Sequence, residues 1–220
     1  MLQAATFEFL QGVQEHNNRE WFLENKSRYE RARQDVHELA RQLIAGIAAF
    51  DPTIPSDLDP KLCVMRIYRD VRFSKDKSPY KENFAISISP KGKNFDGPGY
   101  YLHIHPSASL LAGGYWMPGS DELKAIRQEI DYNGDDFRAV IQDPDFLNYF
   151  GSLNTIQSLK TVPKGYDAHH PDIQWLKLKS FTADHALSMP DLTQSVSAEN
   201  LIKGFEKLYP LMCFLRNALS

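Results

Sequence analysis

The sequence FAISISPKGKNFDGPGYYLHIH, residues 84–105, decides the fold class. Its first part alternates apolar residues at 84, 86 and 88 with small residues at 85, 87 and 89. Its last part alternates apolar residues at 100, 102 and 104 with Tyr101, His103 and His105. Such alternation is typical of strands with one buried and one polar face. The prolines and glycines between the two parts predict a long loop, which suits an antiparallel pair.

Further strands are expected on either side of this pair. The segment before it is rich in apolar and β-prone residues, and the segment after it continues the same composition. A last strand is expected late in the chain, after a loop-rich region. The three expected strands cover Leu62–Tyr68, Ser109–Trp116 and Lys179–Ala186.

Helical patterns stand at both ends of the chain. From Trp21 to Phe50, apolar residues recur every seven positions, which predicts one long amphipathic helix. A second amphipathic helix is expected from a cap at Ser197 onward, with a kink at Pro210 because proline cannot continue the hydrogen-bond ladder. The sequence therefore predicts an α+β fold in which a long N-terminal helix and a kinked C-terminal helix flank a central antiparallel sheet. We find no repeat or linker, so one domain over residues 1–220 is expected.

The composition indicates a folded, intracellular protein. The chain has 220 residues, of which 42% are hydrophobic and 24% charged, as in ordinary globular proteins. Its start has no basic cluster before an apolar run, so we expect a cytoplasmic location without a secretion signal or a membrane partner. The longest stretch without charged residues, 97–120, holds three prolines and five glycines and is not a membrane helix. Cys63 and Cys213 lie far apart in apolar settings, so we expect free, buried thiols.

One segment concentrates positive charge. Residues 66–81 read RIYRDVRFSKDKSPYK and hold six cations and two acids. The whole chain has a formal net charge of -3, so this window of +4 leaves -7 for the remainder. The positive charge is therefore local and not a property of the whole surface.

We expect this segment to bind a small anionic molecule that carries a phosphate or a carboxylate. Guanidinium groups donate paired hydrogen bonds to such groups, lysines add point charges, and a turn offers backbone N–H donors. Three aromatic residues of the segment, Tyr68, Phe73 and Tyr80, can stack on a planar group. The polar face of the expected strand at 100–105 is expected to form the floor of the site. The candidate ligand-binding residues are Arg66, Tyr68, Arg69, Arg72, Ser74, Lys75, Lys77, Tyr80, Lys81, Tyr101 and His103.

Two other interpretations of the segment remain open. In the first, Asp70 and Asp76 hold neighbouring arginines in an internal ion-pair network and no ligand binds. In the second, the same cations contact nucleic-acid phosphates, although the sequence has no other basic run of comparable strength to extend the binding surface. The sequence does not decide whether a reaction is catalysed, which residues would be catalytic, or what the oligomeric state is.

No metal or cofactor is expected. His103 and His105 form a His-x-His pair after Gly97, which is similar to the first half of a cupin-type metal motif, but the glutamate of that motif is missing. His103 as a general base stays an open hypothesis. Phosphate-loop, dinucleotide-binding, nucleophile-elbow and His-Glu-x-x-His motifs are also missing.

Five groups of residues along the chain form a distinctive set of motifs: Asn18, Trp21-Phe22, Lys26 and Tyr29; residues 66–74, 76–77 and 79–81; Gly99-Tyr100-Tyr101-Leu102; Gly113-Gly114 with Pro118; and Pro163-Lys164-Gly165-Tyr166. Together they resemble an uncharacterised bacterial and fungal family, the domain of unknown function 2461. The resemblance extends over nearly the whole chain and is most specific between Arg66 and Lys81. It implies one domain and no particular reaction. Family members often carry an acid at the position of His105, which argues against a shared His-x-His metal site.

Overall fold

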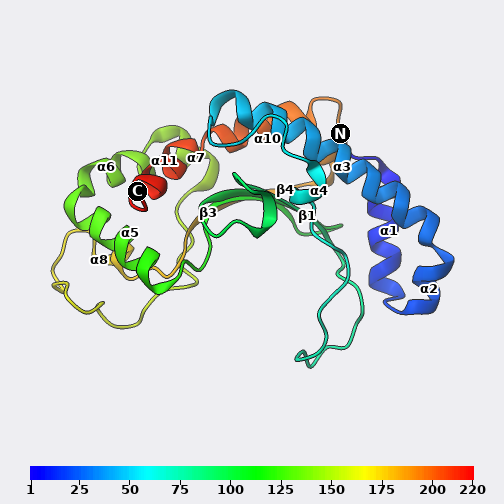
Figure 1. Ribbon diagram of the computed structural model, residues 1–220, viewed down its shortest axis with the longest axis horizontal. Coiled ribbons are helices and arrows are strands. Elements are labelled where there is room, and N and C mark those ends of the chain that lie inside the picture. Colours follow the sequence, from blue (N-terminus) through cyan, green and yellow to red (C-terminus); the bar gives the residue numbers. More distant parts are fainter. The chain divides into compact units, whose positions relative to one another are not determined.

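The strands of the chain form one four-stranded antiparallel sheet (Figure 1). The computed structural model describes all residues, 1–220. The strands are β1 (Phe84–Ile88), β2 (Gly99–Ile104), β3 (Ser109–Tyr115) and β4 (Phe181–Leu187), and they neighbour one another in that order. Strands that follow one another along the chain thus pair, as short antiparallel connections favour. The predicted α+β class is confirmed.

Helices precede, separate and follow the strands (Figure 1). None of them is long and apolar enough to cross a membrane. Before β1 lie α1 (Ala4–Glu15), α2 (Arg19–Glu24), α3 (Lys26–Phe50) and α4 (Pro60–Cys63), and the 3-10 turn η1 (Gly92–Asn94) follows β1. Between β3 and β4 lie α5 (Ser120–Tyr132), α6 (Gly134–Ile141), α7 (Pro144–Phe150) and α8 (Ile173–Leu176); α9 (Met189–Thr193), α10 (Ser197–Glu206) and α11 (Tyr209–Asn217) end the chain.

The chain divides into two compact units. The first unit contains residues 1–95, 101–111 and 186–203, and the second contains residues 96–100, 112–185 and 204–220. Strands β2 and β3 each pass from one unit into the other. One domain over residues 1–220 stays a prediction.

Aromatic packing in the first unit fixes β1 against the N-terminal helices. The Phe84 ring of β1 stacks on Phe9 of α1 at 6.2 Å and on Tyr29 of α3 at 6.3 Å between centroids. All three rings are buried, so each removes a large apolar area from water. These contacts hold β1, and with it the segment that leads into β1, in a defined position.

The second unit has its own aromatic core and one close backbone approach. Tyr100, Phe137, Phe146 and Phe181 are almost fully buried in it. Gly114 of β3 has φ of +121°, and a Cβ added there would lie 2.0 Å from the carbonyl oxygen of Phe181. Only glycine allows both this backbone conformation and this contact between β3 and β4.

The predicted helix over Trp21–Phe50 is two helices. Asn18 caps α2 by accepting a hydrogen bond from the backbone N–H of Trp21 at 3.0 Å. Asn25 then separates α2 from α3, and its side-chain amide donates to the carbonyl oxygen of Trp21 at 2.9 Å. Asparagine competes for backbone partners in this way, which explains the break despite the continuous apolar stripe.

The C-terminal helix bends where the sequence predicts. Helix α10 ends at Glu206 and α11 begins at Tyr209, with Pro210 in its first turn, where a missing N–H costs nothing. Ser197 is the first residue of α10, and its buried hydroxyl makes no hydrogen bond. Its predicted capping role is therefore wrong.

The predicted strand over Leu62–Tyr68 is also wrong. Asp59 accepts a hydrogen bond from Lys61 N–H at 2.9 Å and, with Pro60 following, starts the helical turn α4 instead. Beyond it, pairing is limited to isolated antiparallel bridges of Val64 with Ile86 and of Tyr68 with Tyr80. The β-prone composition of this segment thus produces two bridges and no continuous strand.

Candidate functional site

The cationic segment 66–81 forms a long loop that returns on itself before β1 (Figure 1). Its two arms meet through backbone hydrogen bonds from Arg69 to Pro79 at 2.9 Å and from Lys81 to Ile67 at 2.7 Å. The backbone of Tyr80 is held by Asn17, which accepts from its N–H at 3.1 Å and donates to its carbonyl oxygen at 3.0 Å. The two arms are therefore fixed, and residues 70–78 form the tip of the loop.

Stacked aromatic rings stabilise the arms. Tyr80 lies almost parallel to Phe22 of α2, with 3.9 Å between centroids and 9° between ring planes. Tyr68 packs obliquely against both, at 5.8 Å from Phe22 and 5.5 Å from Tyr80. Tyr80 is buried, whereas Tyr68 is 48% exposed.

Asp76 organises the second half of the tip. Its carboxylate accepts from the Ser78 hydroxyl at 2.6 Å and from the Ser78 N–H at 2.9 Å, and it forms an ion pair with Arg69. These donors favour the ionised form and lower the pKa of Asp76 to about 2. The Arg69 guanidinium is therefore already engaged inside the loop.

Asp70 organises the first half of the tip. It accepts hydrogen bonds from the Arg72 guanidinium at 2.6 and 2.9 Å, and this contact lowers the pKa of Asp70. Lys77 donates to the carbonyl oxygen of Val71 at 2.9 Å. At the tip the structure thus contains the internal ion-pair network that the sequence left open. Phe73 is 96% exposed there, with the Arg72 guanidinium 5.9 Å from its ring centre.

A different set of groups gathers at the base of the loop, and we call it the basal cluster: Arg66, Lys81, Asn83, Tyr101 and His103. The Tyr101 hydroxyl lies 3.1 Å, and the Asn83 side-chain nitrogen 3.4 Å, from Nδ1 of His103. The amide nitrogen of Asn83 can only donate, so Nδ1 of His103 is the acceptor and Nε2 carries the hydrogen. His103 is therefore a neutral imidazole whose Nε2–H remains as a donor.

Burial and neighbouring positive charges lower the pKa values of Lys81 and His103 in the basal cluster. Burial, followed by the neighbouring His105 and the charge of Lys81, lowers the pKa of His103. Burial, followed by the charge of Arg66, lowers the pKa of Lys81. Neither Arg66 nor Lys81 makes an ion pair, although the charge of Arg66 contributes slightly to the lowered pKa of Asp70. Burial raises the pKa of Tyr101. The cluster is therefore cationic without a carboxylate in contact with its cations.

The structure divides the eleven candidate residues into separate groups. Four of them lie in the basal cluster, while Tyr80 belongs to the aromatic stack and Tyr68 to its exposed edge. Arg69, Arg72 and Lys77 have partners inside the tip, and Ser74 and Lys75 lie at the tip near Phe73. Sequence reasoning missed Asn83, because its role depends on a contact with a residue twenty positions later and no local motif marks it.

Comparison with known proteins gives a family for the chain. A family model described as "Conserved hypothetical protein (DUF2461)" matches residues 5–214. The chain belongs to the DUF2461 family. This confirms the resemblance noted in the sequence. No curated protein and no solved structure matches this DUF2461 chain. Its function is therefore argued from the geometry of the chain itself.

His105 does not combine with His103 into a larger group of ligands in this DUF2461 protein. Their rings lie 6.0 Å apart and nearly parallel, and no three His, Cys, Asp or Glu side chains come together in a metal-binding arrangement. Nε2 of His105 lies 3.2 Å from the amide nitrogen of Gln14, and its Nδ1 accepts from the N–H of Ser107 at 3.2 Å. Gln14 also donates to Glu82 at 3.4 Å, so α1 contacts both the residue that follows β2 and the segment that precedes β1.

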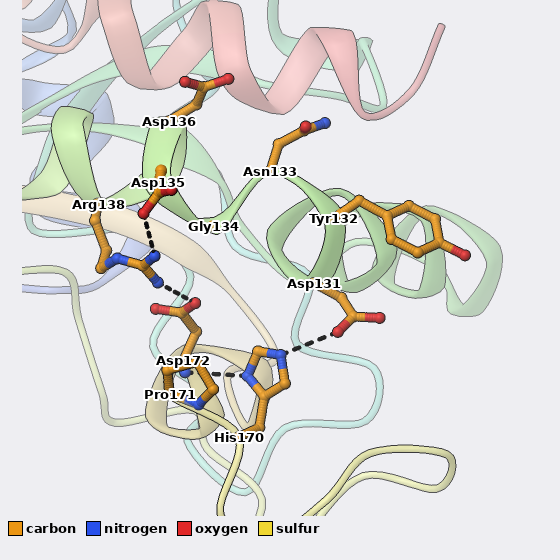
Figure 2. A pocket seen from close by; sticks show the side chains of 10 residues that line it. All are labelled: Asp131, Tyr132, Asn133, Gly134, Asp135, Asp136, Arg138, His170, Pro171 and Asp172. Carbon is orange, nitrogen blue, oxygen red and sulfur yellow. Dashed lines mark hydrogen bonds and ion pairs between the residues drawn. The ribbon is translucent and has the colours of Figure 1, made fainter.

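A pocket of this DUF2461 chain lies in its second unit (Figure 2). The pocket has a volume of about 430 Å³ and an acidic lining between α5, α6 and the segment before α8. Arg138 pairs with Asp172 and, at 2.5 Å, with Asp135. His170 accepts from the Asp172 N–H at 3.0 Å and lies 3.0 Å from Asp131. Figure 2 shows these side chains turned toward one another, so we interpret the network as structural.

Proposed function

We propose that this DUF2461 protein binds a small anion, a phosphate or a carboxylate, at the basal cluster. One observation supports this above all: burial and then the charge of the exposed Arg66 lower the pKa of the half-buried Lys81, and neither side chain makes an ion pair. Keeping such charges together without a counter-ion costs free energy, and a bound anion removes that cost. The cationic tip is less suited, because Asp70 and Asp76 already occupy its arginines.

The groups of the basal cluster suit an oxyanion chemically. Arg66 presents a planar fork for two parallel hydrogen bonds, Lys81 supplies a half-buried ammonium, and Nε2–H of His103 adds a directed donor. Partial burial of Lys81 and His103 strengthens their interactions with an anion relative to bulk water. Tyr101 and Asn83 orient the imidazole and need not contact the anion themselves.

We expect sulfate and phosphate to raise the thermal unfolding temperature of the wild-type protein with a saturable concentration dependence, because a ligand that binds only the native state stabilises it. Arg66→Gln and Lys81→Gln should each weaken anion binding by at least about tenfold, the loss of a charge-assisted hydrogen bond. Arg72→Gln is the matched control, since Arg72 is paired with Asp70 in the tip. Titration calorimetry would give the affinities.

Two outcomes would contradict the proposal. One is an anion effect that is unchanged in both Arg66→Gln and Lys81→Gln. The other is binding of single- or double-stranded nucleic acid that falls steeply with salt and is lost in Arg69→Gln and Arg72→Gln, which would favour the nucleic-acid interpretation.

A further inference from the structure

Tyr68 offers an aromatic surface beside the basal cluster. Three aromatic residues lie in the segment 66–81, and the structure separates them by exposure. Tyr80 is 6% exposed and stacked on Phe22, so both of its faces are unavailable for a ligand ring. Phe73 is 96% exposed but lies at the tip of the loop, among residues engaged in ion pairs. Only Tyr68 is both half-exposed and part of an arm of the loop.

The ring of Tyr68 is held in place by its neighbours. It contacts Phe22 and Tyr80 at oblique angles of 56° and 55°, and these two rings are themselves stacked. Its backbone is bridged to Tyr80, whose backbone is bound on both sides by Asn17. A ring that is already ordered loses little conformational entropy when a ligand stacks on it.

Arg66 lies two residues before Tyr68 on the same arm of the loop. The two side chains are exposed, whereas Ile67 between them is 1% exposed, so Arg66 and Tyr68 share one face of the arm. The chain bends at Ile67, so the Cα atoms of Arg66 and Tyr68 lie at most about 7 Å apart. A ligand whose phosphate is joined to an aromatic ring through a sugar or a short linker spans such a distance. This face therefore combines a guanidinium group that can donate hydrogen bonds to an anion with an aromatic ring on which a ligand ring can stack.

We propose that the basal cluster and Tyr68 together form a site for a phosphate ester that carries an aromatic ring, such as a nucleoside monophosphate. This inference rests on the function proposed above and narrows its ligand class. The phosphate lies at Arg66, Lys81 and His103, and the ring stacks on the exposed part of Tyr68. Because every nucleobase has a π face, the stacking contact itself does not select one base.

The test compares ligands that share the phosphate and differ in the ring. Adenosine monophosphate should bind the wild-type protein about 5- to 150-fold more tightly than ribose 5-phosphate, the range expected for stacking of one base. Tyr68→Ala should remove this preference and leave binding of inorganic phosphate unchanged. Tyr68→Phe keeps the ring and should retain the preference. Arg66→Gln should weaken binding of all three phosphates, as measured by titration calorimetry.

The possible results separate this inference from the proposed function. Phosphate binding with no preference for adenosine monophosphate, or a preference that survives in Tyr68→Ala, overturns the inference and leaves the anion site standing. No binding of any phosphate by the wild type overturns both. A single-stranded oligonucleotide that binds far more tightly than the mononucleotide, with a steep salt dependence, would point to a polynucleotide and also overturn the inference. Thermal unfolding without ligand controls for the folding of each variant.

Discussion

At the scale of single residues, the anion binding proposed above should depend on pH through His103. Its pKa is lowered from the ordinary value of 6.5, mainly by burial, so the unfolded chain takes up a proton at this residue at a higher pH than the native protein does. For His103 alone, the stability of the ligand-free protein therefore falls as the pH drops through that ordinary value. A bound anion has the opposite effect on the residue, because it favours the imidazolium.

We therefore expect the affinity for sulfate to increase as the pH is lowered from about 7 to 5, a range that extends below the ordinary histidine pKa because the pKa of His103 is lowered. Sulfate is the suitable probe because its charge does not change over this range. His103→Gln should flatten the pH profile while preserving a hydrogen-bond donor. Calorimetric titrations at several pH values would measure this, and an equally steep profile in the variant would assign the effect to another group.

At the scale of elements, the tip of the loop is stabilised by its own acids. In Asp76→Asn, the ion pair with Arg69 is lost and the Ser78 contacts weaken, so we expect faster tryptic cleavage after Arg72, Lys75 or Lys77. Because the pKa of Asp76 is lowered to about 2, the wild-type contacts are present above its ordinary value of 3.8 and are lost only as the pH falls through about 2. Limited proteolysis at neutral pH checks the variant. Glu20→Gln, a change in an exposed acid of α2, should leave the rate unchanged, and equal rates for Asp76→Asn and wild type would contradict the idea.

The elements also show what a sequence pattern can and cannot predict. Strand β2 follows its alternation, since Leu102 is buried where His103 is half-buried, and the bend at Pro210 follows from one missing N–H. The pattern at Leu62–Tyr68 misled because β propensity depends on a partner strand, and Asp59 with Pro60 starts a helical turn locally. The candidate site was predicted as the segment 66–81 together with Tyr101 and His103. Which of its cations are neutralised depends on contacts such as Arg69 with Asp76, which composition alone does not determine.

At the scale of the whole molecule, the uncompensated positive charge is confined to fewer residues than the net charge of the segment 66–81 suggests. The segment 66–81 carries +4 in a chain of -3, yet the tip neutralises part of its own charge through Asp70 and Asp76. The uncompensated cations Arg66 and Lys81 stand near the base of the loop, next to β1, which aromatic packing fixes against α1 and α3. A compact site of this kind suits a small anion better than an extended polyanion.

The division of the chain into two compact units leads to a prediction about unfolding. Strands β2 and β3 each contribute residues to both units, so neither unit contains either strand in full. Since a partial sheet leaves backbone groups unpaired, we expect the two units to unfold together in one cooperative transition. Urea unfolding curves from tryptophan fluorescence and far-ultraviolet circular dichroism should coincide, with Trp21 in the first unit and Trp116 and Trp175 in the second. Sulfate bound at the basal cluster should then shift both curves by the same amount. Two separate transitions, with sulfate moving only one, would instead show that the units are independent domains.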